Sequence, residues 1–412
     1  MSSGLPPTVK RLGVVSFLTD ASSEMIYPLL PDFVTRVLGG GPAFLGLIEG
    51  AAETVASLLK IVSGRLSDRL PRRKPLVVAG YGLSSVMRPL MALARAPWHV
   101  LAIRTADRIG KGTRSAPRDA LLAQVTPASQ RGAAYGFHRA LDNAGAMVGP
   151  LVASGLLAWP LPLRTVFALA AVPGALSLLV LLFAVHEEPR AAVPAHRPGT
   201  RDGASDQGAA LGGGLKAYLA VLALFTLGNS SDAFLLLRAR EAGVSLAAVP
   251  LLWAAHHLVK SALGVAGGKL SDRRGRKAVL VAGWAVYALA YAGFALAQRP
   301  WHVWLVFGLY GFYFALTEGA ERALVADLAG SAATGRAFGL FHAITGAMLL
   351  PASLLTGWLW QRAGAPAALL TGAALATVAS LCLVAFVPAP TGTRGTSAPA
   401  PGGSGNDPSP VP

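Results

Sequence analysis

The sequence predicts an all-α integral membrane protein, with twelve transmembrane helices in two six-helix bundles related by an internal repeat. Hydrophobic residues make up 53% of the 412-residue chain and charged residues only 14%, whereas an average soluble domain has roughly 25% charged residues. The apolar residues fall in blocks of about 20, long enough to cross a hydrocarbon layer of ~30 Å as helix. Several short motifs of the first half also recur in the second.

The apolar blocks place the expected helices along the chain. The twelve expected spans are 12–38, 43–64, 76–95, 98–118, 132–158, 162–185, 215–237, 244–267, 278–297, 301–324, 335–361 and 364–387. The polar stretch between the sixth and seventh is rich in Pro, Gly, Ala and Arg, which is typical of a flexible linker. We therefore expect an N-terminal bundle at 1–186, a cytoplasmic linker at 187–214, a C-terminal bundle at 215–387 and a disordered tail at 388–412.

Lys and Arg in the short loops predict the orientation, because cytoplasmic loops carry an excess of both. One set of alternate loops carries most of them: Lys10, Arg11, Arg69, Arg72, Arg73, Lys74, Arg118, Arg131, Arg190, Arg197, Arg201, Arg273, Arg274, Arg276, Lys277 and Arg336. The opposite loops carry mostly single basic residues. We expect a multi-pass protein of the inner (cytoplasmic) membrane with both termini in the cytoplasm.

The same clusters explain the net charge of +16 without a nucleic-acid partner, since they lie between apolar blocks and not on one soluble face. Cys382 is the only cysteine, which excludes an intramolecular disulfide and a metal site built from cysteines. His256 and His257 are adjacent and point to different helix faces, so we expect no metal there. No nucleotide-binding glycine loop is present, and we expect no cofactor and no ATP-driven transport.

The internal repeat is the strongest organisational signal. The loop GRLSDRLPRRK at 64–74 returns as GKLSDRRGRK at 268–277. Three shorter pairs recur in the same order: PWHV at 97–100 and 300–303, FH at 137–138 and 341–342, and SSE at 22–24 with SSD at 230–232. Four ordered pairs indicate two six-span halves.

The repeated loop resembles the signature between spans two and three of the major facilitator superfamily, Gly-x-x-x-Asp-(Arg/Lys)-x-Gly-(Arg/Lys)-(Arg/Lys). The first copy matches at Gly64, Asp68, Arg69, Arg72 and Arg73, with Pro71 in place of the glycine. The second copy matches at Gly268, Asp272, Arg273, Gly275, Arg276 and Lys277. We expect Gly64 to let a neighbouring helix come close, and Asp68 to act in gating by pairing with an arginine or a helix N-terminus. Alternatively, the basic residues only enforce topology.

Two further motifs lie in the fourth and fifth spans. RIGKG, which begins at Arg108, resembles the family's fourth-span motif Arg-x-x-Gln-Gly, whose arginine is associated with proton transfer; Lys111 departs from the usual glutamine. GAMVGP contains Gly145, Gly149 and Pro150 and resembles the fifth-span motif Gly-x-x-x-Gly-Pro, found mainly in exporters that work as antiporters. The alternative is an ordinary packing face of small residues, with a kink permitted by the proline.

Charged residues at membrane depth are costly and usually face the bundle interior or a cavity. With a helical rise of ~1.5 Å per residue, the residues expected near mid-membrane are Asp20, Glu53, Asp107, Arg108, Arg139 and Asp142. Residues four apart share a helix face, which pairs Asp20 with Glu24, Glu49 with Glu53, and Arg104 with Arg108.

These charges allow two interpretations. Acids and bases neutralise each other and hold the bundle together, or one acid is protonated alternately from each side of the membrane. Under the second, the proton-coupling candidates are Asp20, Glu24 and Asp142, with Arg108 as electrostatic partner. The repeat also places residues 229–232 across a central cavity, and the substrate-cavity candidates are Glu53, Asn229, Ser231, Asp232, Tyr27 and Arg139.

The resemblance implies a secondary active transporter and not an enzyme. We expect a proton-coupled antiporter that exports a small organic compound, such as a drug or metabolite, by alternating access at a midplane site. Its partners would be that compound, protons and the lipid bilayer, and a monomer is sufficient because one chain holds both halves. The alternatives are an uptake symporter or uniporter for a small metabolite, and a receptor or assembly scaffold that moves nothing.

Overall fold

The computed structural model describes residues 5–159, 161–187, 212–329 and 334–388, and these ranges contain helices and loops but no strand. The helices of the first half are α1 (Pro7–Ile26), η1 (Tyr27–Leu29), α2 (Leu30–Asp32), η2 (Phe33–Val37), α3 (Pro42–Arg69), α4 (Lys74–Leu90), η3 (Met91–Leu93), α5 (Pro97–Gln124), η4 (Ala128–Gln130), α6 (Arg131–Ala158), α7 (Leu163–Leu169), α8 (Ala171–Leu179) and η5 (Val180–Ala184). Those of the second half are α9 (Gly213–Gly228), α10 (Ala233–Glu241), α11 (Ala248–Arg274), α12 (Arg276–Leu296), α13 (Pro300–Ala329) and α14 (Thr334–Phe386).

Each span expected from the sequence coincides with helical residues. Among the described residues, seven helices are long and apolar enough to cross a membrane by length and composition. One of them, α14, contains two expected spans, 335–361 and 364–387. They meet at Gly364, where a φ of +84° interrupts the helix. Others, such as α5 with Arg104, Asp107 and Arg108, contain too many charges for that criterion. The all-α membrane fold is therefore confirmed, and the count of twelve crossings stays a prediction.

The repeated PWHV motif begins a helix in both halves. Pro97 starts α5 and Pro300 starts α13, a position where the missing N–H of proline costs nothing. The backbone N–H of Ala96 donates to Nδ1 of His99 at 3.1 Å, and that of Gln298 donates to His302 at 3.3 Å. The repeat therefore encodes a proline start with a histidine cap.

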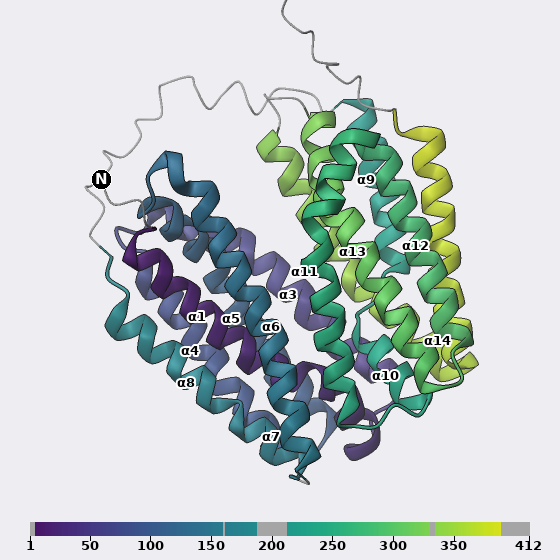
Figure 1. Ribbon diagram of the computed structural model, residues 1–412, viewed down its shortest axis with the longest axis horizontal. Coiled ribbons are helices and arrows are strands. Elements are labelled where there is room, and N and C mark those ends of the chain that lie inside the picture. The colour runs from purple at the N-terminus through teal and green to yellow at the C-terminus, as the bar shows by residue number, and fades with distance from the viewer. Residues whose placement is uncertain (1–4, 160, 188–211, 330–333, 389–412) are drawn as a thin grey trace, which may run out of the picture.

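The two halves form two groups of helices that lie against each other (Figure 1). The groups converge at the end that holds α7 and α10, which we call the closed end, and diverge toward the opposite, open end. Along the interface α3 packs on α14, and α6 packs on α11. The domain limits expected from the sequence stay predictions, since residues 188–211 and 389–412, with Arg190, Arg197 and Arg201, lie outside the described residues.

Small residues let α3 and α14 approach closely at the closed end. A Cβ atom on Gly46 would lie 2.2 Å from the carbonyl oxygen of Ser353, and one on Gly357 would lie 2.6 Å from that of Pro42. Membrane helices associate through such close backbone packing, because lipid supplies no hydrophobic drive between them.

An ion pair also joins the halves at the closed end. Arg240 on α10 donates to Asp32 on α2 at 2.7 Å, and Arg36 reaches the same carboxylate oxygen at 3.3 Å. Nearby, Ser154 on α6 donates to the carbonyl oxygen of Ala247 at 2.7 Å. These contacts hold the two halves together on one side of the central region.

Candidate functional site

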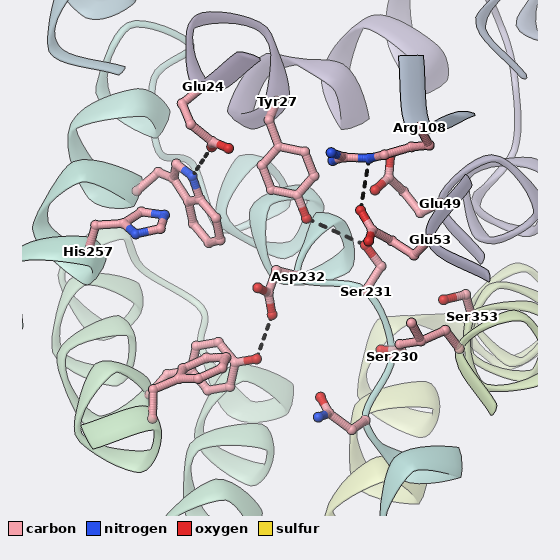
Figure 2. Close-up of a pocket in the computed structure, with 15 residues that line it drawn as sticks. Glu24, Tyr27, Glu49, Glu53, Arg108, Ser230, Ser231, Asp232, His257 and Ser353 are labelled. Atoms are coloured by element: carbon pink, nitrogen blue, oxygen red, sulfur yellow. Dashed lines mark hydrogen bonds and ion pairs between the residues drawn. The ribbon is translucent and has the colours of Figure 1, made fainter. Parts of the chain in front are cut away.

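A cavity of about 300 Å³ lies between the two halves. Its lining residues are Glu24, Tyr27, Glu49, Glu53, Arg108, Asn229, Ser230, Ser231, Asp232, Trp253, His257, Tyr310, Phe314, Leu349 and Ser353, and Figure 2 shows their arrangement. Seven of the ten proton-coupling and substrate-cavity candidates are in this set. Asp20, Asp142 and Arg139 are not.

Two ion pairs form a ladder between α3 and α5 on the first-half side of the cavity. Arg104 donates to both oxygens of Glu49, at 2.9 and 3.2 Å. One helical turn further along, Arg108 lies 2.9 Å from Glu53. The predicted i, i+4 faces are thus present. The acidic face of α3, with Glu49 and Glu53, meets the basic face of α5, with Arg104 and Arg108.

Behind the ladder lies Asp107, which is 3% exposed. Its carboxylate lies 3.2 Å from Arg88 on α4 and 3.9 Å from Arg104. Arg88 also donates to the carbonyl oxygen of Thr19 at 2.9 Å. With the two ladder pairs, three arginines balance three carboxylates inside one half, as buried ionic groups require.

The sequence reasoning missed Arg88, although a signal was present. Within the expected third span, 76–95, the only charged residues are Arg88 and the terminal Arg95. A lone cation inside an apolar span needs a buried carboxylate on a neighbouring helix, which would have pointed to Asp107.

Two cavity carboxylates have no basic partner. Glu24 accepts hydrogen bonds from Nε1 of Trp253 at 2.8 Å and from Ser23 at 3.3 Å. Asp232 accepts one from the hydroxyl of Tyr310 at 2.5 Å. Within the described ranges, no Arg, Lys or His nitrogen lies within the 4.0 Å that defines an ion pair for either carboxylate.

In this conformation Arg108 forms no ion pair with the proton-coupling candidates among the described residues. Arg108 pairs with Glu53 and with neither Glu24 nor Asp142, because α3 lies directly beside α5. Asp142 on α6 instead accepts a hydrogen bond from Ser16 and lies 3.5 Å from His138. Asp20 makes no hydrogen bond or ion pair with the described residues through its side chain.

Aromatic rings form much of the cavity wall. The rings of Tyr27 and Trp253 come from opposite halves and lie 5.3 Å apart. Tyr310 and Phe314 form an edge-to-face pair at 5.2 Å in the second half. The hydroxyl groups of Tyr27 and Ser231 are 3.5 Å apart and link the halves (Figure 2).

Arg139 joins the halves outside the cavity lining. It lies 2.6 Å from Glu318 on α13, which also receives Lys260 at 3.5 Å and Arg322 at 3.4 Å. Lys260 stacks over Phe314 at 4.3 Å. This cluster is partly exposed, so solvent weakens its ion pairs.

The first copy of the repeated loop is anchored within its own half. Asp68 is exposed and lies 3.5 Å from Arg73. Arg73 is buried and donates to Gln124 at 3.0 Å at the end of α5. Arg69 and Arg72 are exposed.

The second copy turns at Gly275, whose φ of +92° joins α11 to α12 without a longer loop. Arg276 pairs with Asp327 of α13 in the same half. Asp272 and Arg273 are exposed, and a Cβ on Gly268 would meet nothing within 4 Å.

The expected close approach at Gly64 is absent in this conformation, where an added Cβ would make an ordinary contact with Ala116 at 3.5 Å. The tight point between α3 and α5 is Gly112, where a Cβ would lie 2.7 Å from the carbonyl oxygen of Ala56.

The fifth-span motif packs α6 on α1. A Cβ on Gly145 would lie 2.3 Å from the carbonyl oxygen of Phe17, and one on Gly149 would lie 2.4 Å from that of Ala21. Pro150 follows inside the helix and is buried. The small face is thus used for packing within the first half.

The sequence profile described as Major Facilitator Superfamily matches residues 12–341 and 217–410. The chain belongs to the Major Facilitator Superfamily. It is 35% identical over 388 residues to an MFS-type transporter of Methanocaldococcus jannaschii, a match that covers 92% of this chain and 95% of the relative. It is 28% identical over 332 residues to the multidrug resistance protein MdtG of Citrobacter koseri, covering 76% and 77%.

Solved structures show the same MFS fold. The nucleoside transporter NupG has a TM-score of 0.74 at 13% identity, and the match covers 92% of this chain and 99% of that one. A POT family transporter in complex with 5-aminolevulinic acid has a TM-score of 0.75 at 14% identity, covering 93% and 96%. These proteins are transporters, and this MFS protein is a multi-pass membrane transporter of small molecules and not an enzyme.

Proposed function

We propose that this MFS protein is a proton-coupled antiporter that exports a small organic compound across the cytoplasmic membrane, with both termini in the cytoplasm. The observation that carries the proposal is the cavity between the halves, whose walls combine ionisable groups from both. MFS transporters hold substrate near the midplane between their halves, which rock about that site. The similarity to MdtG favours export.

The state captured here fits one step of such a cycle. Asp32 and Arg240 link the halves at the closed end, while the helices diverge at the opposite end (Figure 1). The positive-inside prediction assigns the open end to the cytoplasm. In this state the cavity would receive its compound from the cell interior.

Proton coupling requires a carboxylate that can gain a proton without leaving a buried base unpaired. Glu49, Glu53 and Asp107 each pair with an arginine, so their protonation would strand a buried charge. Among the residues that the structure describes, the hydrogen-bond donors to Glu24 are the uncharged Trp253 and Ser23. It is therefore the first of the coupling candidates, followed by Asp20 and Asp142 on the α1–α6 contact.

Inverted membrane vesicles test both direction and coupling. The vesicle interior is acidified, a pH-sensitive dye reports the gradient, and a panel of organic compounds is added. We expect at least one compound to collapse the gradient in vesicles with the unmodified protein and with the control variant Glu241→Gln, whose carboxylate bonds Trp360 and Arg238 away from the cavity lining, but not with Glu24→Gln or in empty vesicles.

Other outcomes contradict the proposal in distinct ways. Compounds that enter intact cells through the protein but leave the gradient untouched would favour an uptake symporter or uniporter. A protein that moves nothing in either assay would be a receptor or scaffold.

A further inference from the structure

The charge balance of the cavity is uneven. The carboxylates of Glu49 and Glu53 are neutralised by the arginines of the ladder. Glu24 and Asp232 line the cavity from opposite halves. Among the described residues, the donors to their carboxylates are uncharged: Trp253 and Ser23 for Glu24, and Tyr310 for Asp232. A carboxylate withdrawn from water is costly unless a positive charge accompanies it.

The nearest lysine of the second half is engaged elsewhere. Lys260 lies 3.5 Å from Glu318 and 4.3 Å from the centre of the Phe314 ring. His257 lines the cavity, but none of its ring nitrogens forms an ion pair with Glu24 or Asp232 in the described structure. The positive charge that would balance Glu24 and Asp232 must therefore come from a bound ligand.

The aromatic rings of the cavity wall are a separate indication of the kind of ligand that the cavity binds. Tyr27, Trp253, Tyr310 and Phe314 line the same cavity, with the Tyr27 and Trp253 rings 5.3 Å apart on opposite halves. Aromatic faces attract organic cations, and quaternary ammonium groups are recognised by cages of such rings. The remaining lining consists of serines, Asn229, Leu349 and His257, and the guanidinium of Arg108 in the same lining is already paired with Glu53.

We propose that this cavity binds an organic cation with an apolar body, its charge placed between Glu24 and Asp232 and its body against the aromatic rings. The proposal rests on the proposed transport function, since it names the substrate class of the same cavity. The cation replaces neutral donors on two carboxylates that belong to different halves. Binding therefore acts on both halves at once, as a site that drives their relative movement must.

Direct binding tests the proposal without a proton gradient. The full chain in nanodiscs is titrated in a calorimeter with tetraphenylphosphonium, benzyltrimethylammonium or benzenesulfonate, and empty nanodiscs give the blank. We expect both cations to bind and benzenesulfonate not to. Glu24→Gln and Asp232→Asn should each raise the cation Kd by roughly tenfold or more, about 1.4 kcal/mol. Asp119→Asn, remote from the cavity, should leave it within about twofold.

Three results would overturn the inference: benzenesulfonate binding as tightly as the cations, no binding of either cation, or unchanged Kd in both cavity variants. The comparison of cations with the sulfonate uses the unmodified protein, so it stands even if a variant fails to fold. Failure here is distinct from failure of proton-coupled export, since vesicles could still exchange protons for a neutral or anionic compound. Conversely, cations that bind but never dissipate the vesicle gradient would refute the antiport proposal and leave the site intact.

Discussion

The ion pair between Asp32 and Arg240 at the closed end offers a direct test of alternating access. Asp32 is 5% exposed and is shared by Arg240 from the other half and Arg36 from its own. Of these two bonds of Asp32, only the one to Arg240 joins the halves, so only that one must break when the closed end opens. Asp32→Asn should therefore shift the protein toward a state in which this end is open.

The size of the shift follows from the kind of bond lost. A hydrogen bond to a charged group contributes about 1.5–3 kcal/mol net, and 1.4 kcal/mol is a tenfold change in an equilibrium. The ratio of open to closed molecules at this end should rise roughly 10- to 150-fold. Arg240→Gln should give a similar shift, and the double variant no more than either, because both substitutions remove one interaction.

Spin labels can measure this ratio by pulsed electron–electron distance spectroscopy. Val37 is 51% exposed in the first half, and Arg299 is exposed just before α13 in the second. Both become labelled cysteines in a background where Cys382 is replaced by alanine. We expect Asp32→Asn to increase the population with the longer distance.

A matched control is available at the same end. Glu241 accepts from Trp360 at 3.0 Å and from Arg238 at 3.3 Å, all within the second half. Glu241→Gln should leave the distance distribution unchanged. If Asp32→Asn behaves like Glu241→Gln, the closed end is held by packing of α3 on α14 and the ion pair has no part in gating.

Two further predictions concern stability. Glu49→Gln should lower the free energy of unfolding by roughly 3–5 kcal/mol, because Arg104 stays buried and loses its closest carboxylate, leaving Asp107 at 3.9 Å; an unchanged thermal midpoint in detergent would contradict this. Gly145→Ala should destabilise by about 1–3 kcal/mol through overpacking against Phe17, whereas Gly155→Ala on the same helix, where a Cβ would meet nothing within 4 Å, should not. Equal midpoints for the two glycine variants would refute the close-packing argument.

The sequence predicted the helices and the faces of the charged residues, but not their partners. Spacing alone showed that Glu49 and Glu53 share one face and that Arg104 and Arg108 share another. It could not show that these faces meet, because which helices are neighbours depends on the packing of the whole half. Spacing therefore could not identify Glu53 as the ion-pair partner of Arg108 in this conformation.

The cavity was partly predictable for a different reason. The repeat relates residues 22–24 to 230–232, and symmetry-related positions of two halves face the same central axis. Asp232 was identified in this way, and Glu24 from its charge inside an apolar span. Phe314, Leu349 and Ser353 carry no charge to mark them, so their place in the lining emerges only from the packed structure.

The distribution of interactions suggests how one chain can be rigid within its halves and mobile between them. The balanced network of Arg88, Arg104, Arg108 and their carboxylates lies wholly inside the first half. Breaking it would strand buried charge, so it moves as a unit.

Across the cavity, by contrast, the halves are joined by single hydrogen bonds from uncharged donors, Trp253 to Glu24 and Tyr27 with Ser231. A bond between neutral groups contributes about 1 kcal/mol and one to a carboxylate about 1.5–3 kcal/mol, and the charged pair of Arg139 with Glu318 is partly exposed and correspondingly weak. A bound cation could outcompete contacts of this strength, whereas it could not dismantle the arginine network. The cavity is therefore placed where occupancy can change the relation between the halves without disturbing either one.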